Sequence, residues 1–166
     1  MTMKVFSKLV QILTTIIAVL AIIMFIFPLA LGIRPFIVLS GSMEPVIKTG
    51  SIVYINTNVH SSEIEKKDII AFKLNNQTVT HRVVEVNKND ETFITKGDAN
   101  KDSDAVPVSF INYRGKTIFS IPYVGKVVAF FKSKFGLISL GALIILNMLL
   151  VVVENDNDED KNHEKK

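Results

Sequence analysis

The sequence contains no cysteine and no tryptophan, and it has only 8 glycines and 5 prolines in 166 residues. The lack of cysteine excludes disulfide bonds, thiolate metal sites and a cysteine nucleophile. Charge is also missing over two long stretches, residues 9–33 and 135–153, which are 25 and 19 residues long. A bilayer core of about 30 Å is crossed by about 20 apolar residues. The missing charge therefore argues against a soluble cytosolic protein.

Basic residues exceed acidic ones only slightly, 19 to 16, so the net charge is +3. Residues 34–134 carry 14 basic and 10 acidic side chains. No dense block of lysine and arginine alternates with aromatic residues, so we expect no nucleic-acid partner. The mild positive charge favours a weak attraction to anionic headgroups, which makes membrane lipid an expected partner.

The first uncharged run, residues 9–33, follows a short segment that carries Lys4 and Lys8. A cleavable signal peptide has the same order of parts, but its apolar region is only about 7–15 residues long. We therefore predict an uncleaved transmembrane helix over 9–33. The second run, 135–153, predicts another transmembrane helix, with a buried core helix as the alternative. Asn147 within it is the type of residue that hydrogen-bonds to a neighbouring membrane helix.

The orientation follows from the two lysines near the N-terminus, because positive charge favours the cytoplasmic side and the first helix usually dominates. Residues 1–8 are then cytoplasmic and residues 34–134 extracytoplasmic. Lysines just before the second run oppose this orientation. The acidic segment 154–166 is expected to return to the cytoplasm as a disordered tail. These expectations together describe a multi-pass protein of the cell membrane.

The middle segment, residues 34–134, is rich in short β-forming runs that are separated by polar breaks. Residues 78–86 alternate best, with Val79, His81 and Val83 on one face. We therefore predict a mainly β fold, a small antiparallel domain with a coiled or barrel-like sheet, between two transmembrane helices. The expected strands are residues 36–39, 51–55, 69–73, 78–86, 92–95, 106–111 and 116–121.

Ser40 and Ser42 lie two residues apart directly after an apolar strand. In extended backbone they point to the same side, and Gly41 leaves room beside them. Ser42 is a candidate nucleophile, although serine is weak at neutral pH without a base. The alternative is a plain Ser-Gly-Ser turn.

His81 interrupts an apolar β face, whereas His60 sits in a polar loop and His163 in the acidic tail. A histidine at such a position is either a general base or a core residue with a satisfied ring. Residues 98–104 bring three aspartates into one loop and supply candidates for the acid that orients such a base. An EF-hand reading fails, because the glycine at position 6 and the glutamate at position 12 are absent. The alternative is a surface turn rich in Asp and Asn.

Four stretches, in this order along the chain, resemble the type I signal peptidase family, in the endoplasmic-reticulum and archaeal subclass that some Gram-positive bacteria also carry. They cover residues 36–128, nearly the whole middle segment, and the preceding membrane anchor matches too. The stretches are Val-Leu-Ser-Gly-Ser-Met-Glu-Pro at 38–45, Thr-His-Arg-Val-Val at 80–84, Thr-Lys-Gly-Asp through Asp104 at 95–104, and Ile-Pro-Tyr-Val-Gly-Lys-Val at 121–127.

The resemblance implies a serine endopeptidase of the Ser-His-Asp subclass that uses no metal or other cofactor. It makes Ser42 the nucleophile and His81 the general base, in place of the lysine of most bacterial members. By position Asp104 orients His81, and Asp98 is structural or assisting. The hydroxyl of Ser40 and the backbone N–H of Ser42 would form the oxyanion hole. One departure is Ser51, because the family usually has aspartate after that glycine, and this puts a local hydrogen bond in doubt.

The implied substrates are secretory preproteins, cut after a small-x-small site, with an accessory subunit of unknown identity as a further partner. The substrate would bind extended beside a strand edge. From their place beside the serine and the histidine, we expect this groove to be lined by Phe36, Val38, Leu39, Val79 and Thr80.

Three other interpretations stay open at this point. A self-cleaving repressor-type protease of similar fold would use lysine and lack membrane spans. An inactive membrane-anchored accessory module would be expected to have lost the serine, the histidine or the acid. A specialised peptidase with few preproteins is not separated from a housekeeping one by any residue.

Overall fold

The computed structural model describes the chain from residue 2 to residue 163, and its side chains from residue 5 to residue 149. The chain forms two compact units. One unit comprises residues 25–128, and the other combines residues 1–24 with 129–166.

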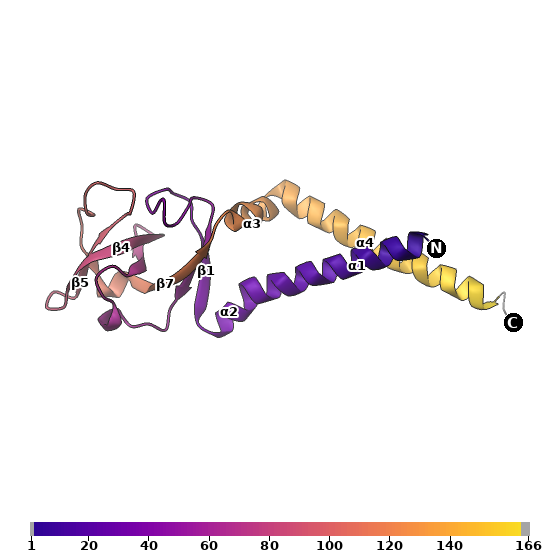
Figure 1. Cartoon of the computed structure of the whole chain (residues 1–166), viewed down its shortest axis with the longest axis horizontal. Helices are drawn as coiled ribbons and strands as arrows, with labels where there is room; N and C mark the ends of the chain where they lie inside the picture. Colours follow the sequence, from indigo (N-terminus) through magenta and orange to yellow (C-terminus); the bar gives the residue numbers. More distant parts are fainter. Residues whose placement is uncertain (1, 164–166) are drawn as a thin grey trace. The chain divides into compact units, whose positions relative to one another are not determined.

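The unit of residues 25–128 is built on one seven-stranded sheet that is antiparallel and curled (Figure 1). Its order is β1-β2-β7-β3-β4-β5-β6, so β1 and β6 are the edges. The mainly β, antiparallel prediction is confirmed. The strands are β1 (Ile33–Ile37), β2 (Ile52–Asn56), β3 (Ile69–Leu74), β4 (Gln77–Asn87), β5 (Thr92–Lys96), β6 (Val108–Ser109) and β7 (Tyr113–Ile121).

The predicted strand boundaries fail at three places. β1 begins at Ile33, three residues earlier than expected, and β6 has only two residues before a 3-10 turn, η3 (Phe110–Asn112). β7 begins at Tyr113, inside the break between the predicted strands 106–111 and 116–121, which includes Gly115. Gly115 lies within the strand at φ +147°, where a side chain would collide with the backbone of Asn56 on β2. Here glycine permits a close approach of two strands and does not mark a turn.

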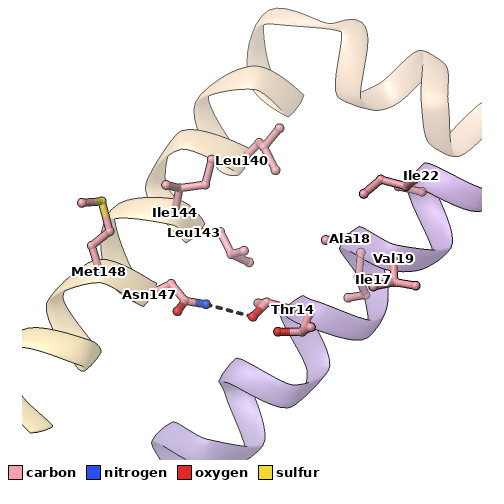
Figure 2. Close-up of a pocket in the computed structure, with 12 residues that line it drawn as sticks. Thr14, Ile17, Ala18, Val19, Ile22, Leu140, Leu143, Ile144, Asn147 and Met148 are labelled. Atoms are coloured by element: carbon pink, nitrogen blue, oxygen red, sulfur yellow. Dashed lines mark hydrogen bonds between the residues drawn. The ribbon is translucent and has the colours of Figure 1, made fainter. Parts of the chain in front are cut away.

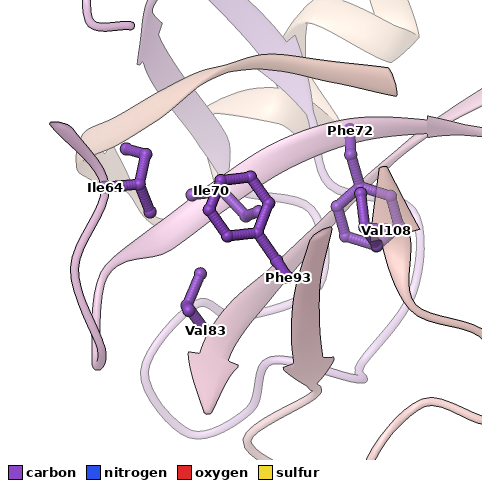
Figure 3. Packing of buried hydrophobic residues seen from close by; sticks show 6 residues of the cluster. All are labelled: Ile64, Ile70, Phe72, Val83, Phe93 and Val108. Carbon is purple, nitrogen blue, oxygen red and sulfur yellow. The ribbon is translucent and has the colours of Figure 1, made fainter. Parts of the chain in front are cut away.

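Apolar residues pack on both faces of the sheet. Ile70 and Phe72 of β3 join the cluster that Figure 3 shows, which also contains Ile64, Val83, Phe93 and Val108. Ala71 joins a second cluster with Met43, Ile47, Val53 and Ile55. This division follows from the period of a strand, because successive side chains point to opposite faces. Full burial stabilises each large side chain by roughly 1.5–3 kcal/mol.

One helix is long and apolar enough to cross a membrane, Val5–Ala30, with a mean hydropathy of 2.8. It consists of α1 (Thr2–Ala21), a π-helical turn η1 (Ile22–Ile26) and α2 (Phe27–Ala30). The π turn precedes Pro28, which has no N–H to donate to the preceding turn of the helix. The helix ends at Ala30, three residues before the expected boundary.

The second apolar run forms part of α4 (Lys134–His163), which follows α3 (Val124–Lys132). Within the residues described, the run reaches the criteria for a span only when Lys134–Leu149 is joined to α3 across a bend of 84°. Helix α4 continues through the acidic segment to His163, where we expected disorder, and residues 164–166 lie outside the described part of the chain.

Helices α1 and α4 contact each other within their own unit. The side-chain amide of Asn147 donates a hydrogen bond of 3.2 Å to the hydroxyl oxygen of Thr14 (Figure 2). Asn147 therefore makes the interhelical contact that its position in an apolar run predicted. The surrounding cleft is almost entirely apolar, with Leu140, Leu143 and Ile144 facing α1.

Candidate active site

Ser42 lies at the start of a turn that follows β1 and packs against the core. The neighbouring Met43 is buried, as is Ile47, and the two are joined by a hydrogen bond from the N–H of Ile47 to the carbonyl of Met43. The carboxylate of Glu44 accepts hydrogen bonds from the N–H and the hydroxyl of Thr49, at 3.1 and 2.8 Å. The buried Met43 and the hydrogen bonds between Glu44 and Thr49 therefore fix the backbone directly after Ser42.

His81 lies on β4, and its side chain contacts Ser42. Its Nε2 lies 3.1 Å from Ser42 Oγ, and its Nδ1 lies 2.6 Å from Asp104 Oδ2. With a proton on Nδ1 donated to the carboxylate, Nε2 is free to accept the serine proton. His81 is 8% exposed, and its ring packs against the Phe72 ring in a T-shaped arrangement. The predicted Ser42, His81 and Asp104 thus form one hydrogen-bonded series.

Thr95 is part of this series, and the sequence analysis missed it. Its hydroxyl donates to Asp104 Oδ2 at 2.6 Å, and its carbonyl accepts from the N–H of Asp104 at 2.8 Å. Thr95 is fully buried on β5. The only available signal was a polar residue at an inward-facing strand position, which does not by itself identify its partner.

Asp98, proposed as structural or assisting, lies against Arg82 and not against His81. Arg82 binds it through two hydrogen bonds, Nε to Oδ1 at 2.7 Å and Nη2 to Oδ2 at 2.6 Å. A third bond runs from Arg82 Nη1 to the carbonyl of Lys67. The hydrogen bond to Asp98 raises the pKa of Arg82 above its ordinary value. Asp102, the third aspartate of the loop, is exposed.

The loop after β5 also contacts the Ser42 backbone. The N–H of Ala99 donates to the carbonyl of Ser42 at 2.9 Å. Gly97 passes so close that an added Cβ would lie 2.6 Å from the same oxygen. The glycine of this motif is therefore required by the close approach of two loops, and the sequence alone gave no sign of which segment approaches it.

Ser40 is exposed, and its Oγ lies 3.4 Å from Ser42 Oγ, on the side that their spacing predicted. Ser51, which departs from the family pattern, is buried and donates to the carbonyl of Lys48 at 2.6 Å. The hydroxyl thereby has a partner within the turn that it occupies.

A groove of about 430 Å³ lies beside Ser42. It is lined by all five of the predicted residues, Phe36, Val38, Leu39, Val79 and Thr80, and by both Ser40 and Ser42. Buried Met43, Ile47 and Val53 also line it.

One edge of β4 is open along this groove. Residues 77–81 pair with β3, whereas the pairing of β4 with β5 begins only at Arg82. Among the described residues no strand pairs with the second edge of 77–81. An extended peptide can therefore add to the sheet at that edge, directly next to the serine.

A mainly β domain that joins a serine, a histidine and an aspartate in this way has the arrangement of a serine hydrolase. Comparison with known families narrows the class. The family described as "Signal peptidase, peptidase S26" matches residues 8–130, and the chain belongs to this family. The resemblance drawn from the four motif stretches is confirmed.

Several characterised relatives are similar to parts of the chain. Signal peptidase I W of Bacillus subtilis is 43% identical over 89 residues, 51% of this chain and 47% of the relative. The signal peptidase complex catalytic subunit SEC11C of Rattus norvegicus is 31% identical over 127 residues, 66% of each chain. The subunit SEC11 of Lodderomyces elongisporus is 29% identical over 120 residues, 63% of this chain and 71% of that protein. The match thus spans about half of the Bacillus protein and just under two thirds of the rat subunit.

Proposed function

We propose that this chain is a membrane-bound serine endopeptidase that removes N-terminal signal peptides from exported preproteins after a small-x-small site. The observation that carries the proposal is the hydrogen-bonded series Ser42–His81–Asp104 beside an open strand edge. Membership of the signal peptidase family supports the substrate class.

In the proposed mechanism, Ser42 Oγ attacks the scissile carbonyl carbon and transfers its proton to His81 Nε2. Asp104 holds the ring in the productive orientation and stabilises the imidazolium. The C–N bond then breaks, and the imidazolium gives its proton to the leaving amine of the mature protein. Water, activated by the same nitrogen, hydrolyses the acyl ester on Ser42 and restores the enzyme.

Charge that develops on the carbonyl oxygen needs donors on the serine side of the site. We assign this role to the Ser40 hydroxyl and the backbone N–H of Ser42. The position of Ser40 Oγ beside Ser42 Oγ supports the first donor. In the described part of the chain the N–H of Ser42 makes no hydrogen bond, which supports the second.

The substrate specificity follows from strand geometry. A peptide added to the edge at residues 77–81 points alternate side chains to the same face. Two side chains separated by one residue then enter the groove, while the residue between them faces away. Buried Met43, Ile47 and Val53 limit the depth of that groove, so small side chains fit at both positions.

For the membrane arrangement we propose two spanning helices with both termini in the cytoplasm. The apolar helix Val5–Ala30 supports the first span, and the hydrogen bond between Asn147 and Thr14 supports a second helix beside it. Because the chain has no cysteine, single substitutions can report topology. In intact cells an impermeant maleimide should label Ser61→Cys but label Thr2→Cys and Asn162→Cys only after permeabilisation. Labelling of Asn162→Cys in intact cells would contradict the second span.

The activity is tested with the detergent-solubilised full chain and a model preprotein. Processing after a small-x-small site should disappear in both Ser42→Ala and His81→Ala. Loss in Ser42→Ala with retention in His81→Ala would keep the nucleophile and exclude the histidine as base. The rat relative is named as a subunit of a complex. If the wild type cleaves only after membrane extract is added, an accessory subunit is needed; if it fails in both conditions, the inactive accessory module is favoured.

A further inference from the structure

Two lysines lie against one exposed tyrosine. Lys48 Nζ lies 5.6 Å and Lys126 Nζ 5.7 Å from the centre of the Tyr123 ring. Lys48 Nζ also lies 3.5 Å from the Tyr123 hydroxyl oxygen. All three residues are exposed and come from separate segments, the turn before β2, the turn after β7 and the first turn of α3. We call them the lysine–tyrosine cluster.

No carboxylate pairs with either ammonium group in the described part of the chain. Glu44 is near enough to feel the charge of Lys48, but its carboxylate is occupied by Thr49. Ammonium groups over a ring face are held only weakly at exposed sites. The cluster thus concentrates two positive charges without a counter-anion of its own.

The backbone is shaped around this cluster. Gly50 adopts φ +81°, and the stem of Lys126 lies across it so closely that an added Cβ would be 2.7 Å from Lys126 Cγ. Tyr123 itself adopts φ +65°, a left-handed conformation that is uncommon for a residue other than glycine. Gly125 packs against the carbonyls of Gly50 and Ser51. Segments that carry the three residues are therefore packed together around Gly50.

We propose that the lysine–tyrosine cluster binds the phosphate of an anionic membrane phospholipid. A phosphate placed between the two ammonium groups accepts charge-assisted hydrogen bonds from both, and the Tyr123 hydroxyl is a further donor. The ring then packs beside the glycerol part of the headgroup, as amphipathic tyrosines do at membrane interfaces. Nothing in this binding step involves Ser42, His81 or Asp104.

The path of the chain favours a lipid over a free phosphate. The cluster's turn is tied to Val38 by the hydrogen bond from the N–H of Gly50 to the Val38 carbonyl, 2.9 Å. Val38 is eight residues from Ala30, the end of the apolar helix Val5–Ala30, so that distance is at most about 29 Å. On the other side Tyr123 leads into α3, nine residues or about 14 Å of helix, before the second run. The inference rests on the proposed membrane anchoring and not on catalysis.

The test measures lipid bound to the detergent-solubilised full chain by native mass spectrometry, with equal amounts of phosphatidylglycerol and phosphatidylcholine added. The wild type should retain phosphatidylglycerol preferentially. Each lysine near a lipid surface contributes about fivefold in affinity, so Lys48→Gln/Lys126→Gln should lower phosphatidylglycerol retention about 25-fold. Retention of phosphatidylcholine should not change.

The matched control is Lys66→Gln/Lys88→Gln, which removes the same charge from two exposed lysines outside the cluster and should retain the wild-type preference. Equal loss in both double variants, with thermal unfolding unchanged, would show a bulk charge effect and overturn the proposal. Undiminished preference in the cluster variant would overturn it as well. Displacement of the lipid by millimolar inorganic phosphate would assign the cluster to free phosphate. Peptidase activity, followed in parallel, separates these outcomes from failure of the proposed enzymatic function.

Discussion

The backbone amide of Ala99 donates a hydrogen bond of 2.9 Å to the carbonyl of Ser42. The bond joins the loop after β5 to the proposed nucleophile from behind, while Asp104 of the same loop contacts His81. One segment thereby sets the position of the serine backbone and of the carboxylate. Any change that displaces this loop should act on both ends of the Ser-His-Asp series together.

Gly97→Ala tests this coupling. The new Cβ would lie 2.6 Å from the Ser42 carbonyl, so one of the two loops must move. Misplacement of a reacting group by about 1 Å costs on the order of 100-fold in rate, and we expect a loss of kcat of that order. Steady-state cleavage of a model preprotein gives the value. Gly141→Ala is the control, because an added Cβ there meets nothing within 4 Å, and its kcat should stay at the wild-type level.

Asp104→Asn and Asp98→Asn should affect different properties. Asp104 orients His81, and loss of the equivalent charge in a serine protease lowers kcat by about 10,000-fold while the geometry survives. Asp98 binds Arg82 through two hydrogen bonds. Its replacement should therefore lower the unfolding temperature, with a smaller loss of kcat than in Asp104→Asn. Turnover and thermal unfolding are measured on both variants. A larger loss of kcat in Asp98→Asn would reverse the assignment.

The seven β strands and most of their bounds along the chain could be predicted, because alternation of apolar residues indicates one buried face. The predicted strand 78–86 differs from β4 by one residue at each end. The break expected at Gly115 was wrong, since glycine is common both in turns and where two backbones approach closely. The local sequence does not distinguish a glycine in a turn from a glycine at a close approach. The two are distinguished only when the neighbouring strand is known.

The candidate site could also be predicted only in part. Ser42, His81 and Asp104 were predicted from the family resemblance, as was the role of Ser40. Spacing alone predicted only that Ser40 and Ser42 point to the same side. The contact between Asp98 and Arg82 was not predicted. The two residues are sixteen apart in the sequence and meet only through the pairing of β4 with β5. Thr95 escaped for a similar reason. Contacts that depend on sheet register are absent from any single stretch of sequence.

Thr95→Val should lower kcat without unfolding the domain. The change keeps the side-chain shape but removes the hydroxyl that donates to Asp104. A hydrogen bond to a charged group is worth about 1.5–3 kcal/mol, so we expect a loss of roughly tenfold or more. Thr117→Val is the matched control, because its hydroxyl is buried without a partner in the described residues and its removal should leave kcat unchanged. Equal activity of the two variants would exclude Thr95 as a positioning residue.

Glu44 should make the stability of the Ser42 turn depend on acidity. Hydrogen bonds from the backbone and side chain of Thr49 hold the pKa of Glu44 below its ordinary value of 4.5. A carboxylate whose pKa is lowered by folding stabilises the native state above the unfolded-state pKa, and this contribution is lost as the pH falls through the folded-state pKa. Glu44→Gln should therefore unfold at a lower temperature than the wild type at pH 7, and the difference should shrink below pH 4.5. Thermal unfolding of the full chain in detergent measures this difference in unfolding temperature.

Glu85→Gln is the control. Its carboxylate makes no hydrogen bond within the described residues, so this variant should follow the wild type at both pH values. A Glu44→Gln difference that persists unchanged at low pH would attribute the effect to side-chain packing and not to the ionised carboxylate.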